Sequence, residues 1–175
     1  MNSNLIETKR LILRPITKND VHDFFELDAN PKVHLFLGNK PVKTIKESEA
    51  MIDSILKQYK TNGIGRLAII KKTTNECIGW AGLKYEENLR KEFNYYDLGY
   101  RLKEQFWGKG YATEAAIASL NYGFKDLKLK EIGAAADVNN MASNTILKKI
   151  GLKPAGTFTY EDTLCNWYLL QNPNL

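Results

Sequence analysis

The sequence predicts a mixed α/β domain with a mostly antiparallel sheet of about seven strands. Two observations predict it. Capping boxes followed by apolar residues at helical spacing mark helices, and alternating segments between turn residues mark strands. The length of 175 residues is that of one domain, expected to span residues 1–175. The expected order is strand, helix, helix, three strands, helix, strand, helix and two strands.

The first third of the chain predicts one strand and two helices. The strand is expected over residues 11–16. Residues 17–20 have the capping-box form and start a helix that Pro31 ends. A second capping box over residues 44–47 starts a helix with apolar residues at i, i+3, i+4 and i+7. That apolar face is formed by Ile52, Ile55, Leu56 and Tyr59.

Three consecutive strands follow, over residues 67–71, 77–85 and 93–102. The third alternates most cleanly, because one of its faces carries four apolar or aromatic side chains. These are Tyr96, Leu98, Tyr100 and Leu102. Short turns between the strands favour an antiparallel meander.

The last part of the chain predicts a helix from residue 112, a strand over residues 131–138 and a helix over residues 140–150. The first helix carries a stripe of small residues, which lets its axis approach the sheet closely. Asn140 is a good N-cap and Gly151 a good C-terminal stop for the second. A hairpin over residues 157–170 ends the fold. The strand, helix and strand over residues 93–138 are expected to form a parallel crossover.

Composition excludes several classes of protein. Lys+Arg 25 against Asp+Glu 20 gives a net charge of +5, spread evenly along the chain without a basic tail. No apolar run approaches the ~20 residues that span a membrane, and residues 1–10 lack a signal-peptide core. Cys77 and Cys165 form neither a disulfide framework nor a metal motif. We therefore expect a cytoplasmic protein with no metal, no membrane partner and no nucleic-acid partner.

The segment Gln105–Ala112 is the most informative one. Gly108 and Gly110 allow the backbone to approach a ligand closely, and their N–H groups at a helix N-terminus form an anion site. Lys109 adds a positive charge. A dinucleotide fingerprint would need glycine at Thr113, and a P-loop would need a different glycine spacing. The segment predicts a site for a pyrophosphate outside both of those motifs.

The same segment matches the Q/R-x-x-G-x-G/A signature of the GNAT N-acetyltransferases through Gln105, Gly108 and Gly110. Over about residues 7–170 the chain resembles the branch of the ribosomal-protein N-terminal acetyltransferases. Further motifs carry this resemblance in the same order along the chain. They are Glu7–Arg14, Cys77–Leu83, Asp97–Leu102, Trp107–Ala115, Asn140–Asn144 and Ile150–Leu152.

The resemblance implies acetyl-CoA as co-substrate and a sheet splayed between its fourth and fifth strands. The pantetheine arm would lie between residues 98–102 and 133–138, with amides near Gly99 polarising the thioester. The implied contacts are Leu98, Gly99, Tyr100, Arg101, Leu102, Gln105, Phe106, Trp107, Gly108, Lys109, Gly110, Tyr111, Ala112, Asn140, Ser143 and Asn144. Taken singly, Gly99 and the alanines at 134–136 are equally explained by packing.

The resemblance also implies direct attack of an amine on the thioester. Many members protonate the leaving thiolate with a tyrosine, but the corresponding residue here is Leu147. The ribosomal-protein branch uses a serine instead, which corresponds to Ser143; that residue is equally explained as part of a first helical turn. Asp162, with Glu161 beside it, corresponds to that branch's carboxylate base. Both are also ordinary turn residues, and water is a further candidate for the base.

The expected function is therefore that of an acyltransferase, an N-acetyltransferase that moves acetyl from acetyl-CoA to a primary amine in a ternary complex. The acceptor is left open among a protein N-terminus, a polyamine, an amino sugar antibiotic and a metabolite, and a homodimer is plausible for the family. Aromatic residues form either an acceptor groove or core: Trp80, Tyr85, Tyr100 and Trp167. A non-catalytic module that binds or senses CoA is the alternative, since Leu147 replaces the tyrosine. A nucleic-acid binder rests on the net charge alone.

Overall fold

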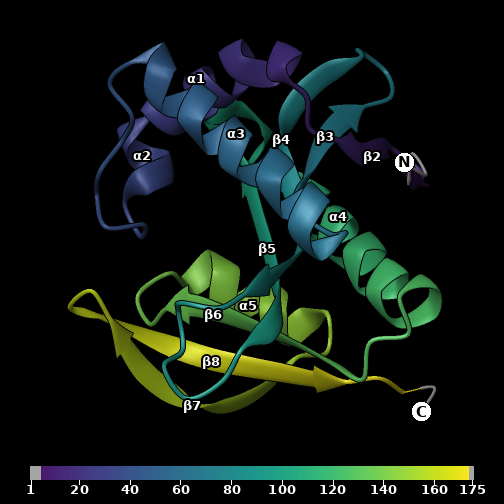
Figure 1. Ribbon diagram of the computed structural model, residues 1–175, viewed down its shortest axis with the longest axis vertical. Helices are drawn as coiled ribbons and strands as arrows, with labels where there is room; N and C mark the ends of the chain where they lie inside the picture. Colours follow the sequence, from purple (N-terminus) through teal and green to yellow (C-terminus); the bar gives the residue numbers. More distant parts are fainter. Residues whose placement is uncertain (1–4, 174–175) are drawn as a thin grey trace.

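The computed structural model describes residues 5–173 as one mixed sheet with helices on both faces (Figure 1). The strand order is β1-β2-β3-β4-β5-β6-β8-β7, with eight strands against the seven or so predicted. The fold class is confirmed, and the additional strand is the short β1. The predicted domain includes residues 1–4 and 174–175, which lie outside the described residues. The expectation that residues 1–10 lack a signal-peptide core also falls partly on residues 1–4.

The elements follow the predicted order with two additions, the strand β1 and the short helix α2. The strands are β1 (Ile6–Glu7), β2 (Leu11–Pro15), β3 (Leu67–Lys71), β4 (Glu76–Glu86), β5 (Tyr95–Leu102), β6 (Glu131–Asp137), β7 (Lys153–Tyr160) and β8 (Thr163–Gln171). The α-helices are α1 (Val21–Ala29), α2 (Pro31–His34), α3 (Ile45–Asn62), α4 (Tyr111–Asn121) and α5 (Met141–Lys149). Short 3₁₀ turns precede α1 and α4, at Lys18–Asp20 and Glu104–Phe106.

Both predicted capping boxes are present. The box at Thr17 caps the 3₁₀ turn before α1, and the box at Thr44 caps α3. Pro31 does more than end a helix: α1 stops at Ala29, and Pro31 is the first residue of α2. Proline suits that position because the first N–H of a helix has no intrahelical partner.

The sheet is divided at β5, which joins the upper and lower halves of the molecule in Figure 1. The pairs on either side of this point are antiparallel, whereas β5 and β6 are parallel and meet at one residue pair, Asp97 and Gly133. The predicted parallel crossover and splay are therefore confirmed. Counting β1, the strands that separate are the fifth and sixth.

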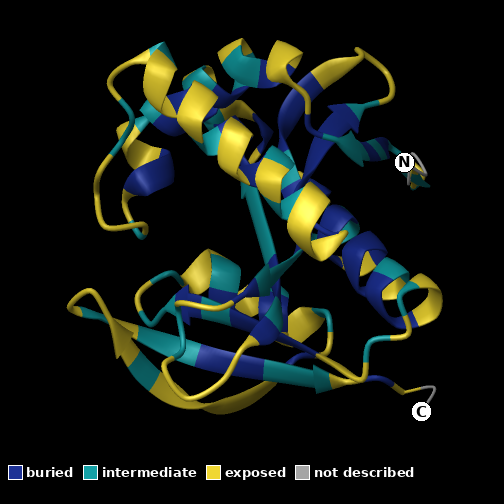
Figure 2. Ribbon diagram, in the orientation of Figure 1, coloured by how far each residue is buried: buried dark blue, intermediate teal, exposed yellow. Residues whose placement is uncertain are grey.

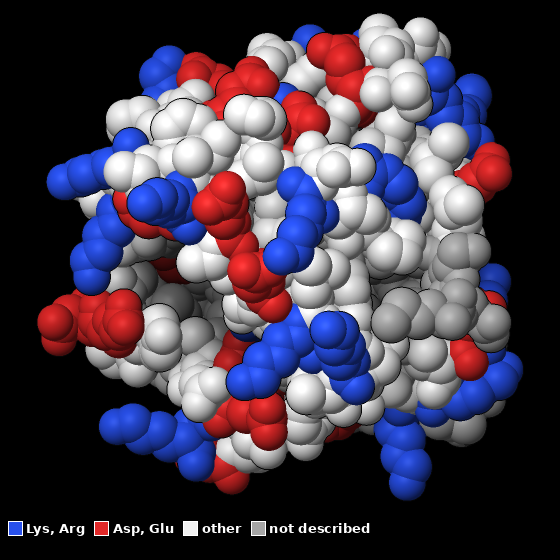
Figure 3. All heavy atoms as spheres, turned by 45° about the horizontal axis from the view of Figure 1, so that its top comes forward, with Lys and Arg blue, Asp and Glu red and all other residues white. Residues whose placement is uncertain are grey.

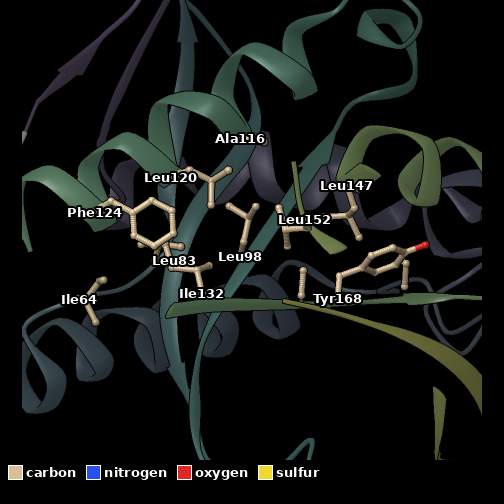
Figure 4. Close-up of a cluster of buried hydrophobic side chains, with 12 residues drawn as sticks. Ile64, Leu83, Leu98, Ala116, Leu120, Phe124, Ile132, Leu147, Leu152 and Tyr168 are labelled. Atoms are coloured by element: carbon tan, nitrogen blue, oxygen red, sulfur yellow. The ribbon is translucent and has the colours of Figure 1, made fainter. Parts of the chain in front are cut away.

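A hydrophobic core fills the space between the lower half of the sheet and the helices α4 and α5 (Figure 4). The small-residue stripe of α4 contributes Ala116 to this core, and Ala115 is equally buried. After α4 the chain continues as a π-helical turn, Tyr122–Asp126, which the sequence did not predict. A Cβ on Gly123 would lie 2.6 Å from Cδ1 of Leu83, so close packing explains the small residue there.

The elements differ in how far they are buried. Figure 2 shows the outer side of α3 and most of β7 exposed, while the middle of β8 is buried. No helix within residues 5–173 is both long enough and apolar enough to cross a membrane.

Candidate functional site

The loop after β5 presents a row of backbone N–H groups. Trp107 anchors it, since its indole N–H donates to the carbonyl oxygen of Leu102 at 2.8 Å. Gly108 and Gly110 have φ angles of +70° and +78°, a left-handed conformation that favours glycine. Among the described residues, the N–H groups of Gly108, Lys109 and Gly110 donate to no protein acceptor. Together with the start of α4, these donors attract an anion.

Arg10 supports this loop from the first strands, an arrangement that the sequence did not predict. Its Nε donates to Oε2 of Glu114 at 2.6 Å, and its Nη1 donates to the carbonyl oxygen of Lys109 at 2.9 Å. Its guanidinium also stacks on the ring of Tyr111 at 4.4 Å. Burial acts to raise the pKa of Glu114, but hydrogen bonds from Thr8 and Arg10 hold it below its usual value. The charged pair therefore ties the loop to the N-terminal strands.

The edge of β5 beyond Asp97 is the second part of the site. Because β5 and β6 pair only at Asp97 and Gly133, the backbone of residues 98–102 has no partner strand on that side. An extended ligand can complete such an edge with main-chain hydrogen bonds. The residues predicted to contact the pantetheine arm lie along it: Leu98, Gly99, Tyr100, Arg101 and Leu102.

Arg66 fills the space over Gly99 on one face of the sheet. Its guanidinium donates to the carbonyl oxygens of Gly82 and Asp97 and to the carboxylate of Asp97. A Cβ on Gly99 would lie 2.6 Å from Nη2 of Arg66, which is only 7% exposed. Burial raises the pKa of Asp97, although the charge of Arg66 acts to lower it. Packing, one of the two explanations left open by the sequence, accounts for Gly99 on this face.

The opposite face of β5 brings Tyr100 to Ser143. The hydroxyl of Tyr100 lies 3.2 Å from Oγ of Ser143, and it also donates to the backbone oxygen of Ser143 at 3.2 Å. Burial raises the pKa of Tyr100 to about 12, so its hydroxyl keeps its proton at neutral pH. Two protonated hydroxyl groups therefore meet beside the parted strands. From the sequence, Tyr100 is predicted to contact the pantetheine arm and is a candidate for the acceptor groove. Its side-chain contact with Ser143 was not predicted.

The Asn144 side chain, predicted to contact the cofactor, is engaged within the protein. Its Nδ2 donates to the carbonyl oxygens of Asp137 and Asn140, at 2.8 Å and 2.7 Å. Its Oδ1 accepts from Nδ2 of Asn166 and from the hydroxyl of Tyr168, at 2.8 Å and 2.7 Å. Both hydrogens and both lone pairs of this amide are thus engaged within the protein. Asn144 thereby joins β6, α5 and β8, and its contact with the cofactor stays a prediction.

Asn140 caps α5, as its sequence position predicted. Its Oδ1 accepts a hydrogen bond from the backbone N–H of Ser143 at 3.1 Å. The cap fixes the first turn of the helix and thereby the position of the Ser143 side chain. Leu147, two turns further along in the core, is 1% exposed. A leucine there is explained by burial among the other apolar side chains.

Glu161 and Asp162 form the exposed two-residue turn between β7 and β8. Their φ angles are +43° and +63°, the left-handed pair that a type I′ hairpin turn requires. In Figure 1 this turn projects at the lower left, away from the sheet. Turn chemistry accounts for both residues, and their use as a base stays a prediction.

The four aromatic residues considered for an acceptor groove lie on both faces of the sheet. Trp80 lies between two guanidinium groups, 5.3 Å from that of Arg66 and 5.0 Å from that of Arg101. Trp167 shares this face. Tyr85 packs against Tyr96 on the opposite face, with ring centroids 5.3 Å apart. Trp80 is half-buried and Trp167 is only 4% exposed, so Trp80 is the one of the two that an acceptor on the Arg66 face would meet.

One cluster of the described residues has atoms close enough to hold a metal ion: Asp20, Asp23 and Cys77. Protein groups already engage it. Asp20 forms a bidentate pair with Arg14, and Asp23 pairs with Lys103. Burial raises the pKa of the Cys77 thiol to about 11, so it is protonated at neutral pH. These contacts explain the cluster as a structural ion-pair network.

The surface around the loop has both charge signs. Basic and acidic side chains are interspersed on the face shown in Figure 3. A groove of about 740 Å³ begins at Gly110 and runs along α4 under residues 5–9. Its lining is of mixed charge, with the bases Lys9, Lys125 and Lys149 and the acids Glu7, Glu114 and Asp126. The groove next to the loop is therefore as mixed in charge as the surface around it.

Comparison with known proteins identifies similar chains. The family described as acetyltransferase (GNAT) domain matches residues 10–153. The "Uncharacterized N-acetyltransferase YoaA" of Bacillus subtilis (strain 168) is 32% identical over 152 residues, which cover 87% of this chain and 84% of that protein. The "Spermidine N(1)-acetyltransferase" of Escherichia coli (strain K12) is 24% identical over 150 residues, covering 85% and 76%.

A solved structure shows the same fold at low sequence identity. It is RimL, a ribosomal L7/L12 alpha-N-protein acetyltransferase in complex with coenzyme A. The TM-score is 0.80 at 19% identity, and the alignment covers 96% of this chain and 98% of that one.

Proposed function

Because this chain belongs to the GNAT acetyltransferase family, we propose that it moves the acetyl group of acetyl-CoA to a primary amine by direct attack in a ternary complex. The single observation that carries the proposal is the pairing of two features at one end of β5. One is a loop with outward N–H donors, and the other is a strand edge without a partner. An anionic pyrophosphate suits the first feature, and an extended amide-containing arm suits the second.

The residues present fit acetyl-CoA. The N–H groups of Gly108, Lys109 and Gly110 would hold the pyrophosphate, because a Cβ at Gly108 would meet nothing and the space beside it is open. The edge of β5 over residues 98–102 would hold the pantetheine arm. When bound, acetyl-CoA supplies an activated acetyl group as a thioester.

The two faces of β5 divide the chemistry. As the amine attacks, a C–N bond forms, the C–S bond breaks and the sulfur leaves as a thiolate. Ser143 and Tyr100 lie on one face and would donate a proton or a hydrogen bond to that sulfur. The acceptor would approach from the other face, where Trp80 and Trp167 lie. An alkyl amine has a pKa of about 10 and must lose a proton before it attacks.

The candidates for the general base are a carboxylate and water. Asp162 and Glu161 keep this role as a prediction from the resemblance. Both are exposed turn residues, whereas the pKa of a catalytic carboxylate is typically raised toward neutrality by burial. Water at the exposed side of the site would serve equally well, since the acceptor amine needs only to lose its proton to solvent.

The acceptor is not given by the relatives, because their names differ on it. RimL acts on a protein α-amine and the Escherichia coli relative on spermidine. The test is release of the free CoA thiol from acetyl-CoA with a panel of amines: peptides with varied N-termini, spermidine and aminoglycosides. We expect release with at least one of them. Binding of acetyl-CoA without release on any amine would favour the non-catalytic module instead.

A further inference from the structure

Arg90, between β4 and β5, is enclosed by aromatic rings. Its Cζ lies 4.8 Å from the ring centroid of Phe93, 4.6 Å from that of Phe158 and 5.2 Å from that of Trp167. These three rings are called the aromatic cage below. The Arg90 side chain is 14% exposed, while Phe93 is 41% exposed. The cage is therefore filled by a cation and open to solvent on the side of Phe93.

The cage is held in place by contacts among the rings. Trp167 packs edge-on against Tyr95 with ring centroids 4.6 Å apart, and it lies 5.8 Å from Phe93 and 6.3 Å from Phe158. The rings come from β7, β8 and the segment before β5. Phe93 and Phe158 are therefore held by Trp167 as well as by Arg90.

The cage lies at the point where β5 and β6 part. A Cβ on Gly133 would lie 2.8 Å from Cζ2 of Trp167 and 2.9 Å from Cδ2 of Tyr95. Gly133 pairs with Asp97, so these rings are on the face of the sheet that carries Arg66. Ser143 and Tyr100 are on the opposite face. Under the proposed function, this is the side from which the acceptor approaches.

Arg90 is weakly held compared with Arg66. Among the described residues it has one charged partner, Glu92, whose carboxylate lies 3.1 Å away and whose side chain is 64% exposed. Ion pairs of this kind contribute little because solvent screens them. Arg66, by contrast, donates to two backbone oxygens and a buried carboxylate. Ring faces provide most of the attraction on Arg90, and another cation can use the same attraction.

Tyr95 adds a neutral ring behind Trp167, because burial and the neighbouring carboxylates of Asp97 and Glu86 raise the pKa of its hydroxyl. Those two carboxylates are themselves paired, Asp97 with Arg66 and Glu86 with Lys84. The attraction for a cation in the cage therefore comes from the ring faces.

We propose that the aromatic cage binds a second positively charged group of the acceptor, an ammonium or a guanidinium, and that Arg90 occupies the cage until the acceptor displaces it. The inference rests on the proposed function for the identity of its ligand. It makes the substrate class an amine with a further cationic group nearby.

The test opens the cage with Arg90→Ala and uses choline as the probe, with its neutral isostere 3,3-dimethylbutan-1-ol for comparison. Binding is followed by the NMR signal of the Trp167 indole N–H, identified by its loss in Trp167→Phe. Lys91→Ala is the matched control, because it removes the same charge from the same segment. We expect choline to bind Arg90→Ala about tenfold more tightly than it binds the wild type or Lys91→Ala. The isostere should show no such gain.

A second variant tests the ring contribution. Adding Phe158→Leu to Arg90→Ala should return choline binding to the wild-type level while amide exchange shows the sheet intact. Equal binding of choline and its isostere by Arg90→Ala, or a gain in Lys91→Ala of the same size, would overturn the proposal. The titration contains no acetyl-CoA and no turnover, so its result is independent of the thiol-release assay. Release without cage binding would reject the cage alone, and cage binding without release would reject the transferase.

Discussion

Two pairs of glycines lie on or beside the parted strands β5 and β6, and each pair requires glycine for a different reason. In the loop after β5, Gly108 and Gly110 have left-handed backbones, and an added Cβ at Gly108 would meet no atom within 4 Å. At the parted strands, Gly99 and Gly133 lack the left-handed φ, but an added Cβ would collide with Arg66 or Trp167. Gly108 faces open space and an added Cβ on Gly110 would touch Nη2 of Arg10 at 3.4 Å, whereas the second pair is closed by the protein itself.

The difference teaches which residues a ligand can reach. A glycine required by backbone conformation beside empty space leaves room for a ligand to approach the chain. A glycine required by a neighbouring side chain reports internal packing, even when it lies in a conserved-looking motif near the site. The loop should therefore govern acetyl-CoA affinity, and the strand glycines should govern stability.

The largest effect is expected at Gly108. In Gly108→Asp a carboxylate would enter the position proposed for the pyrophosphate, and repulsion at about 4 Å is worth several kcal/mol near a protein surface. We expect acetyl-CoA affinity to fall by about a hundredfold or more, measured by calorimetry. The melting temperature should fall by only a few degrees, from the left-handed backbone, since no protein atom is near the new side chain.

Gly108→Ala is the matched control for that variant. It introduces the same backbone strain, of about 1 kcal/mol, without the charge. Its acetyl-CoA affinity should therefore fall far less than that of Gly108→Asp. Unchanged affinity in Gly108→Asp would remove the pyrophosphate from this loop.

The second effect is on stability, at Gly133. In Gly133→Ala the methyl group would press on the rings of Trp167 and Tyr95, which are themselves packed edge to face. Overpacking of this kind costs about 1–3 kcal/mol, and we expect the upper part of that range by urea denaturation. Ala135→Ser, a small change on the same strand, should cost less. A Gly133→Ala variant as stable as the wild type would mean that the two rings shift without cost and that packing is not the reason for the glycine.

The third effect tests the same idea at Gly99 by a double-mutant cycle. Gly99→Ala should cost about 2 kcal/mol in the free energy of unfolding, because Arg66 is held in place by three acceptors. Arg66→Lys keeps a positive charge for Asp97 but removes the atoms that the methyl group would meet. In that background Gly99→Ala should cost about 1 kcal/mol less than in the wild type. Strictly additive costs would show that Arg66 is not the reason for the glycine.

This contrast also explains how far the sequence alone reaches. The loop glycines, the capping boxes at Thr17 and Thr44 and the parallel crossover are signalled by neighbouring residues, and each could be predicted. The contacts between Arg10 and Glu114 and between Tyr100 and Ser143 join residues 104 and 43 positions apart. No local pattern signals such pairs. For the same reason the sequence does not distinguish the two explanations of Gly99, since Arg66 lies 33 positions away, and it does not signal the hydrogen bonds of Asn144 to Asn166 and Tyr168.

The smallest effect is expected on kcat, at Tyr100 and Ser143. Tyr100 faces Ser143, whereas its neighbour Gly99 faces Arg66 on the other side of β5. Ser143→Ala and Tyr100→Phe each remove one of the two hydroxyl groups beside the proposed thiolate. With an acceptor in hand, we expect kcat to fall about tenfold in each, below the hundredfold typical of a lost general acid, because the other hydroxyl remains. Acetyl-CoA affinity should change less than kcat.

The pH profile and the double variant complete this prediction. Burial raises the pKa of Tyr100 to about 12, so the proton that Tyr100 donates is retained from neutral pH up to about pH 10 and is lost only as the pH rises towards 12. The kcat of Ser143→Ala should therefore show no fall that is due to Tyr100 between pH 7 and 9. The double variant should lose more than either single one. A kcat that is unaltered in both single variants and in the double variant would assign proton transfer to water and leave this hydroxyl pair a purely structural contact between β5 and α5.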